Sequence, residues 1–226
     1  MMRIGVVVPA YNAARFIGEA LESVLGQTVP PDSVVVVDDG SADDTCRVAL
    51  TFGPKVSLVR APHRGIAATR NAGVASLDCD VLAFIDADDR WIPDKLERQR
   101  EVLAAEAVAG FVICHTKAFA TPGLPETERD ALLAQQPVPF AGWNASALLV
   151  RRSTFLHVGD FAEDLAVGET IDWFNRARHL GVIGRVLPEV LVERRLHRDN
   201  TTRVQRRDHR DYLAMAKRHL DRSRGG

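Results

Sequence analysis

Residues 33–41 read SVVVVDDGS, a run of four valines that ends abruptly in two acids and a glycine. Because no polar residue interrupts the valines, the run predicts a strand buried on both faces, as strands of a parallel sheet are. Residues 80–89, DVLAFIDADD, again join an apolar strand to carboxylates. A carboxylate at the end of a buried strand needs a partner or a bound metal, because unpaired buried charge is costly.

Strands and helices alternate around these two runs. Residues 3–9, RIGVVVP, predict the first strand, and Asn12 offers an N-cap for the amphipathic helix that TVPP at residues 28–31 ends. Alternation through about residue 107 is typical of an open, doubly wound α/β sheet, in which ligands bind beyond the carboxyl ends of the strands. The other predicted elements of this half are a strand at residues 55–60 and helices at residues 41–50, 65–77 and from Pro93 onward.

The second half shows weaker patterns and no repeat or linker that would divide the chain. Residues 121–139 are polar and rich in proline, which favours a surface excursion or a short helix. Predicted strands lie at residues 110–119, 145–150 and 182–193, and predicted helices lie at residues 169–180 and 204–220.

The composition fits one globular domain, since the chain has 226 residues of which 46% are hydrophobic and 26% charged. No apolar run approaches the roughly 20 residues that cross a bilayer, and the start MMRIGVVVP lacks the features of a signal peptide. We therefore expect a cytoplasmic protein. Cys46, Cys79 and Cys114 are odd in number and widely spaced, so we expect small core residues rather than disulfides or a zinc site.

The net charge of −1 conceals a basic C-terminal segment: residues 194–226 contain eleven Lys or Arg and four Asp. Such a segment fits a solvated helix, a partner for a diphosphate, or peripheral contact with the anionic inner face of the membrane. We expect no nucleic-acid partner, and the sequence does not indicate an oligomeric state.

Asp86 and Asp88 are two residues apart, so both point to one face while the strand persists, with Asp89 on the other. Two carboxylates on one side match Mg²⁺ or Mn²⁺, which take carboxylate, water and substrate phosphate together. The alternative is an acid-rich turn that caps the helix at Pro93, because such strings are common in turns.

Six short motifs lie along the chain. They are PAYN at residues 9–12, VDDGSADDT at 37–45, ATRNAG at 68–73, FIDADDRW at 84–91, GETIDW at 168–173 and RRLHRDNTT at 194–202. In order and spacing they resemble the family 2 glycosyltransferases with the GT-A fold. The resemblance implies a single Rossmann-like, mostly parallel sheet flanked by helices.

The same resemblance implies one GT-A domain over residues 1–203, with a nucleotide-binding half to about residue 107 and an acceptor-binding half from about residue 108. A basic helix or tail would follow at residues 204–226. The implied reaction moves a sugar from a UDP-, GDP- or dTDP-sugar donor to an unknown acceptor hydroxyl, with inversion. Mn²⁺ or Mg²⁺ would neutralise the charge that builds on the departing nucleoside diphosphate.

Roles follow from the resemblance residue by residue. Tyr11 would lie near the base, and Asp39 would accept hydrogen bonds from the base or ribose. His197 and its basic neighbours, Arg195 among them, would fold over the diphosphate, while the other histidines are expected to be surface or core residues. The implied nucleotide-sugar-binding residues are Pro9, Tyr11, Asn12, Asp39, Arg70, Asp86, Ala87 and His197, and the implied metal ligands are Asp88, Asp86 and His197.

The acceptor hydroxyl also needs a base, and here the sequence departs from the family. Thr170 occupies the place of the aspartate that usually serves, and a threonine hydroxyl cannot act as a base near neutral pH. Glu169 and Asp172 share a face of the predicted helix, so either could be the catalytic residue instead. Otherwise Glu169 caps the helix, Asp172 pairs with Arg176, and the activity is weak, altered or absent.

Trp143 and Asn144, in the segment FAGWNAS, are candidates for acceptor binding. Trp143 could stack on a sugar ring, although its sequence context fits a core aromatic equally well.

Other classes of protein compete with an active enzyme. One is a nucleotide-sugar or carbohydrate-binding protein of the same fold, in which the threonine at position 170 marks a lost activity. A receiver-type phosphoacceptor domain carries its acid pair after its first strand, whereas a whole strand and helix precede VDDGS here. A nicotinamide dehydrogenase would carry GxGxxG after the first strand, and this chain does not.

Overall fold

The computed structural model describes residues 2–134 and 139–197. The predicted helix at residues 204–220, the basic tail and its membrane contact lie outside the described residues. Within those residues, no helix is both long and apolar enough to cross a membrane.

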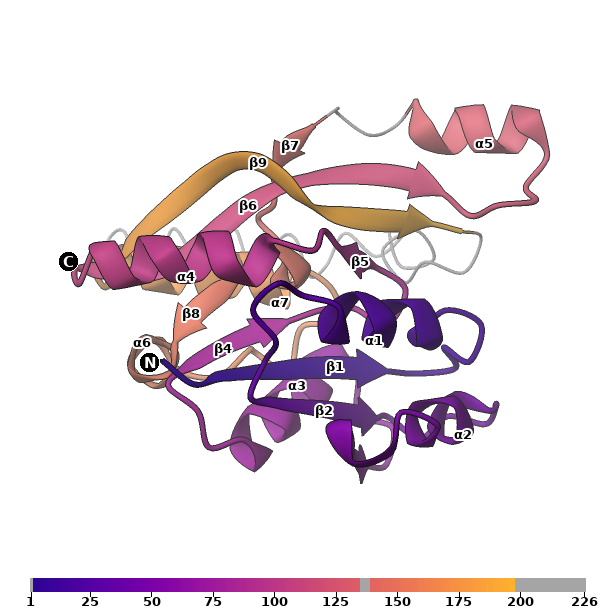
Figure 1. Cartoon of the computed structure of the whole chain (residues 1–226), viewed down its shortest axis with the longest axis horizontal. Coiled ribbons are helices and arrows are strands. Elements are labelled where there is room, and N and C mark those ends of the chain that lie inside the picture. The colour runs from indigo at the N-terminus through magenta and orange to yellow at the C-terminus, as the bar shows by residue number, and fades with distance from the viewer. Residues whose placement is uncertain (1, 135–138, 198–226) are drawn as a thin grey trace.

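One sheet runs through the described part of the chain, with the strand order β3-β2-β1-β4-β8-β6-β9-β5 and with β7 paired to β6 (Figure 1). Its strands are β1 (Ile4–Ala10), β2 (Ser33–Asp38), β3 (Ser57–Arg60), β4 (Val81–Phe84), β5 (Arg90–Trp91), β6 (Ala109–Ala120), β7 (Phe140–Ala141), β8 (Leu149–Arg151) and β9 (Ile183–Leu196).

Strand direction divides the sheet into two parts. The strands β3, β2, β1 and β4 are all parallel, with Pro9 opposite Val37 and Val7 opposite Phe84. Beyond β4, the short strand β8 is antiparallel to both of its neighbours, whereas β6 and β9 again run parallel to each other. The prediction of one mostly parallel sheet is confirmed, and the antiparallel strands β5, β7 and β8 make it a mixed sheet.

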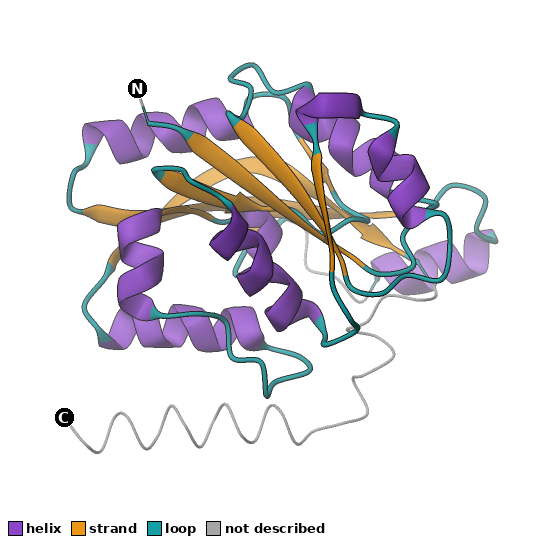
Figure 2. Cartoon of the chain, turned by 90° about the horizontal axis from the view of Figure 1, so that it is seen from below, coloured by secondary structure: helices purple, strands orange, loops and turns teal. Residues whose placement is uncertain are grey.

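Helices cover both faces of this sheet (Figures 1 and 2). Figure 1 shows α1 and α4 on the near face and α3 behind the sheet. The helices are α1 (Ile17–Leu25), α2 (Thr45–Leu50), α3 (Ile66–Ser76), α4 (Lys95–Ala105), α5 (Glu126–Leu133), α6 (Arg152–Val158) and α7 (Glu169–His179), with 3-10 turns η1 (Gly53–Lys55) and η2 (Ala145–Ala147).

The core forms where the valine-rich strands meet these helices. All seven residues of β1 are buried, which agrees with the uninterrupted apolar runs in the sequence. Gly73 brings α3 close to β1, because a Cβ at this position would lie 2.3 Å from Val7 Cγ1. This close approach sets the helix that carries Arg70 directly over the strands. The three cysteines are buried and free, as predicted.

Several local predictions need correction. Asn12 does not cap α1, which begins at Ile17; instead its backbone adopts φ 47° and its Oδ1 accepts a hydrogen bond from Ala42 N at 2.9 Å. The strand β4 ends at Phe84, so Asp86 and Asp88 lie in a turn rather than on a strand. The predicted short helix within residues 121–139 is confirmed as α5.

Candidate functional site

The carboxyl end of β2 leads into Asp39, whose side chain is buried and fastens the loop before α3. Asp39 Oδ1 accepts from Arg64 N at 2.8 Å, and Oδ2 accepts from Gly65 N at 2.9 Å. Gly65 takes φ 94°, a conformation that favours glycine, and this lets its N–H point at the carboxylate. Both carboxylate oxygens of Asp39, a residue predicted to bind the nucleotide, therefore accept hydrogen bonds from this loop.

Tyr11 and His63 form a stacked pair next to Asp39. Their ring centroids are 4.3 Å apart with the planes 27° from parallel, and His63 Nδ1 lies 2.8 Å from Asp39 Oδ2. Both rings are half exposed, so the pair offers an aromatic surface to a ligand. His63 is thus a surface histidine, as expected, and it also packs against Tyr11 and contacts Asp39.

Two further residues predicted to bind the nucleotide sugar are buried and apolar. Pro9 is buried within β1, and Ala87 is buried in the turn after β4. Neither presents a polar side chain, so any contact with a ligand would come from the backbone.

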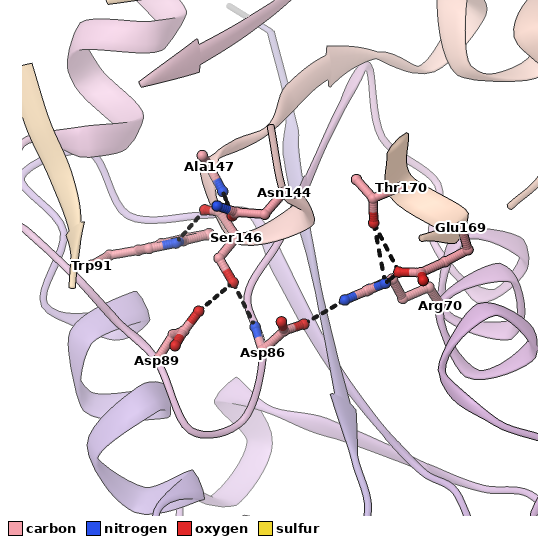
Figure 3. A network of polar contacts seen from close by, with 9 residues as sticks. All are labelled: Arg70, Asp86, Asp89, Trp91, Asn144, Ser146, Ala147, Glu169 and Thr170. Atoms are coloured by element: carbon pink, nitrogen blue, oxygen red, sulfur yellow. Dashed lines mark hydrogen bonds and ion pairs between the residues drawn. The ribbon is translucent and has the colours of Figure 1, made fainter. Parts of the chain in front are cut away.

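Arg70 joins the two halves of the site (Figure 3). Its Nη2 donates to Asp86 Oδ1 at 2.6 Å, and its Nη1 donates to Glu169 Oε1. The guanidinium is only 3% exposed. Burial lowers the pKa of Arg70, but the charges of Asp86 and Glu169 outweigh burial and raise the pKa above its ordinary value. One fixed cation thus connects the turn after β4 with the start of α7.

Asp88 faces the end of β9. Its Oδ2 lies 3.0 Å from His197 Nε2, and both side chains remain partly exposed. The structure therefore brings together two of the three residues predicted to bind a metal, Asp88 and His197, and places the third, Asp86, in the same turn as Asp88.

Arg195 does not fold over a diphosphate, contrary to expectation, because it is 2% exposed and points inward. Its Nε donates to the backbone oxygen of Asp88 at 2.9 Å, and its Nη2 donates to Glu19 Oε2 at 2.6 Å. Its guanidinium also lies 4.6 Å from the ring centroid of Phe119. Arg195 therefore supports the turn that carries the acids.

Asp89 is the inward-facing acid of the same turn. Its Oδ2 accepts from Ser146 Oγ at 2.7 Å, and its Oδ1 accepts from Arg195 N at 3.1 Å. Burial, with smaller contributions from Asp88 and Asp86, raises the pKa of Asp89 well above its ordinary value. The three acids of FIDADD thus divide into two that face outward and one that is internal.

The residues around Asp88 fit a divalent cation of the Mg²⁺ or Mn²⁺ type. Such ions bind through one or two carboxylates and complete their coordination with water and substrate phosphate. Asp88 and His197 supply a carboxylate oxygen and an imidazole nitrogen at one point. No group of three or more His, Cys, Asp or Glu among residues 2–134 and 139–197 could hold an ion alone. The donor set therefore matches an ion that arrives with a phosphate-bearing ligand.

The two candidate bases differ in their surroundings. Glu169, the first residue of α7, accepts from Thr170 Oγ1 at 2.8 Å as well as from Arg70. Asp172 is 2% exposed and its Oδ2 accepts from Arg176 Nε at 2.8 Å. Arg176 in turn donates to the backbone oxygen of Val158 at 2.6 Å. Asp172 thus belongs to an internal pair, whereas Glu169 belongs to the Arg70 cluster.

Trp143 and Asn144, the residues predicted to bind the acceptor, directly precede η2. Trp143 is 50% exposed and packs edge-on against Phe174, with the ring centroids 5.0 Å apart. Asn144 caps η2, since its Oδ1 accepts from Ala147 N at 3.1 Å. Trp143 is therefore a half-exposed aromatic that packs on Phe174, and the Asn144 side chain stabilises the start of η2.

Comparison with known proteins agrees with this geometry. A sequence profile described as "Glycosyl transferase family 2" matches residues 5–146. The chain belongs to glycosyl transferase family 2. An uncharacterised glycosyltransferase of Rickettsia typhi is 26% identical to it in an alignment that covers 94% of this chain and 70% of the relative.

Solved structures of this kind show the fold. The structure of S. aureus TarS in complex with UDP-GlcNAc has a TM-score of 0.71 and 20% identity, and covers 89% of this chain and 61% of that one. A mannosyltransferase from Pyrobaculum calidifontis, in complex with GDP-Man and Mn²⁺, has a TM-score of 0.74 and 20% identity, and covers 97% and 64%. This family 2 chain therefore has the GT-A fold and spans less than two thirds of each of those chains.

Proposed function

We propose that this chain transfers a sugar from a nucleotide-sugar donor to an acceptor hydroxyl, with inversion at the anomeric carbon and with the help of Mn²⁺ or Mg²⁺. The observation that carries the proposal is the bridge through Arg70. It joins Asp86, in the turn predicted to bind the donor, to Glu169, on the helix predicted to supply the base. The buried guanidinium of Arg70 therefore contacts both a carboxylate predicted to bind the donor and the carboxylate predicted to act as the base.

The donor would lie along the carboxyl ends of β1, β2 and β4. Tyr11 and His63 would contact the base, and Asp39 would hold the loop that carries His63 in place. Asp88 and His197 would bind the divalent ion, whose charge favours departure of the nucleoside diphosphate. UDP-GlcNAc and GDP-Man in the two similar structures support a nucleotide sugar as the ligand class.

Glu169 is the better of the two candidate bases. It begins α7 beside Arg70, which orients its carboxylate, and it would take the proton of the acceptor hydroxyl as that oxygen attacks. Asp172 would keep its structural bond to Arg176. Trp143, the exposed aromatic on this side, would contact the acceptor.

A second candidate function is binding of a nucleotide sugar without transfer. The observation that favours it is the pairing of Glu169 Oε1 with both Arg70 and Thr170, which occupies one of the two oxygens that a base could use.

One set of experiments separates the two functions. UDP-, GDP- and dTDP-sugars are first screened by thermal shift with and without Mn²⁺, because a ligand of the folded state raises the apparent stability. The ligand that binds is then used to assay transfer and hydrolysis by the wild type, Glu169→Gln and Asp172→Asn. We expect Glu169→Gln to keep donor binding and to lose about 100-fold or more in transfer rate. Donor binding without any turnover in the wild type would instead support the binding protein.

A further inference from the structure

The turn after β4 has an outer side and an inner side. Asp86 and Asp88 keep 36% and 26% of their side chains exposed, whereas Asp89 is 4% exposed. Asp89 N also donates to the backbone oxygen of Asp86 at 3.0 Å, which closes the turn. Because the turn is closed in this way, the contacts that fix Asp89 also influence the direction of the Asp86 and Asp88 carboxylates.

Two distant elements hold Asp89. One is β9, through Arg195 N at 3.1 Å, and the other is η2, through Ser146 Oγ at 2.7 Å. Figure 3 shows Ser146 placed between Asp89 and Asp86, with one contact to each.

Ser146 has three hydrogen bonds and is 1% exposed. Its hydroxyl donates to Asp89 and accepts from Asp86 N at 3.1 Å, so it binds both ends of the turn. Its backbone oxygen accepts from Trp91 Nε1 at 2.9 Å. Because the hydroxyl is satisfied on both sides, it fixes the turn rather than merely filling space.

The segment that carries Ser146 is itself rigid. Asn144 caps η2, and Gln99 Nε2 donates to the backbone oxygen of Ala147 at 2.8 Å from inside the core. Since Trp143 precedes the same segment, this short stretch also borders the proposed acceptor side.

We propose that Ser146 is a positioning residue that sets the turn 86–89, so that the carboxylates of Asp86 and Asp88 together face the donor and its metal ion. The inference rests on the proposed function for the identity of the ligand. Removing the hydroxyl leaves an oxygen of Asp89 and the N–H of Asp86 without their partner in the interior, and the turn loses its fixed geometry.

The test compares the wild type with Ser146→Ala in two measurements. Hydrogen exchange by mass spectrometry reports order in peptides that cover residues 85–91. Titration with Mn²⁺ in the presence of UDP or GDP reports the concentration needed for half-maximal nucleotide binding. Ser33→Ala is the matched control, because the buried Ser33 hydroxyl has no hydrogen-bond partner among the described residues. Trp91→Phe, which removes the N–H that binds the Ser146 backbone and also makes the buried ring smaller, serves as a second variant that leaves the Ser146 hydroxyl in place.

We expect faster exchange confined to the turn in Ser146→Ala and a half-saturating Mn²⁺ concentration raised by about 10- to 100-fold, as for other supports of metal ligands. Trp91→Phe should shift both readouts in the same direction by less, and Ser33→Ala should shift neither. Unchanged exchange in Ser146→Ala overturns the proposal, and so does faster exchange with an unchanged Mn²⁺ response. A wild type that binds no Mn²⁺ and nucleotide refutes the metal part of the proposed function, whereas the exchange measurement still decides whether Ser146 holds the turn.

Discussion

β1 and β9 run in the same direction and both end at the site, but they reach it in different ways. β1 is buried along its whole length and pairs in uniform register with β2 and β4. β9 is exposed or partly buried from Ile183 to Val190 and contains fully buried residues only from Leu191 onward, and its register against β6 shifts at three places. The first half of the sheet therefore presents its site residues from regular strand ends, and the second half does so across irregular pairing.

The two halves also hold their side chains differently. In the first half, backbone N–H groups of a short loop bind Asp39 directly. In the second half, the long cationic side chain of Arg195 connects β9 to Glu19 and to the turn at Asp88. The comparison teaches that Asp39 is held by a loop 25 residues further along the chain, whereas the turn at Asp88 depends on packing against β9, 107 residues away.

The largest test breaks the connection between the halves. Arg70→Leu leaves the buried carboxylate of Glu169 and the partly exposed carboxylate of Asp86 without their shared cation. We expect the free energy of unfolding to fall by about 3–5 kcal/mol and transfer to be lost. Urea denaturation measures the first effect, and a transfer assay at a temperature where the variant is folded measures the second.

Arg64→Ala is the control for this change, because Arg64 pairs with Glu163 at the exposed surface. Exposed pairs contribute about 1 kcal/mol or less. If Arg70→Leu unfolds at the same urea concentration as Arg64→Ala, the two halves are not joined through Arg70.

A second test sharpens the comparison within the acceptor side. Trp173 is fully buried among Phe111, Phe155 and Phe161, whereas Trp143 is half exposed. We expect Trp173→Ala to cost about 3–5 kcal/mol in unfolding free energy. Trp143→Ala should cost less than half as much and should raise the KM for the acceptor. Equal losses of stability in the two variants would show that Trp143 is a core residue and not an acceptor contact.

A third and smaller test concerns Lys95, which is buried at the start of α4 with Nζ 4.0 Å from the ring centroid of Trp91. Burial lowers the pKa of Lys95 from 10.5 to about 8. Between these values the unfolded chain binds a proton that the folded chain does not, so this group makes stability rise as the pH increases from 8 to 10.5. The rise corresponds to roughly 3 kcal/mol.

Lys95→Met supplies the comparison, since burial also raises the pKa of the neighbouring Cys114 from 9.0 to about 11 and this opposes the rise. The thiol is present in both proteins, and removing the Lys95 charge raises the pKa of Cys114 further, so the stability of the wild type relative to Lys95→Met should increase with pH. Chemical denaturation at pH 7, 8, 9 and 10 measures this difference. A difference that stays constant with pH would mean that Lys95 is charged in the folded core.

The sequence predicted the first half of the sheet more fully than the second half. The valine runs and the carboxylates after them predicted β1, β2 and β4 and the region of the site, because a buried strand leaves little freedom in register or direction. The motif resemblance predicted Arg70 as a site residue and helix spacing predicted Glu169, and the structure brings these two side chains into contact. The strands that carry the candidate site were therefore predicted from the sequence.

Residues whose roles depend on distant partners could not be predicted. Ser146 is one of many serines in the chain until η2 folds against the turn at Asp86, and Arg195 resembles its exposed basic neighbours until β9 meets Glu19. His63 gave one weak signal, its place two residues before the glycine that opens α3. The prediction that Asn12 caps the first helix was wrong because its side chain accepts a hydrogen bond from Ala42 N, in the loop after β2.

The central claim is that acids at the strand ends hold a nucleotide sugar together with a divalent ion. Titration of the wild type and Asp88→Asn with the nucleotide sugar, with and without Mn²⁺, tests it most directly, and Asp78→Asn, an exposed acid away from the site, is the control. The account predicts that Mn²⁺ tightens binding in the wild type and in Asp78→Asn but not in Asp88→Asn, whose affinity falls by about tenfold or more. An equal response to Mn²⁺ in all three proteins would contradict it.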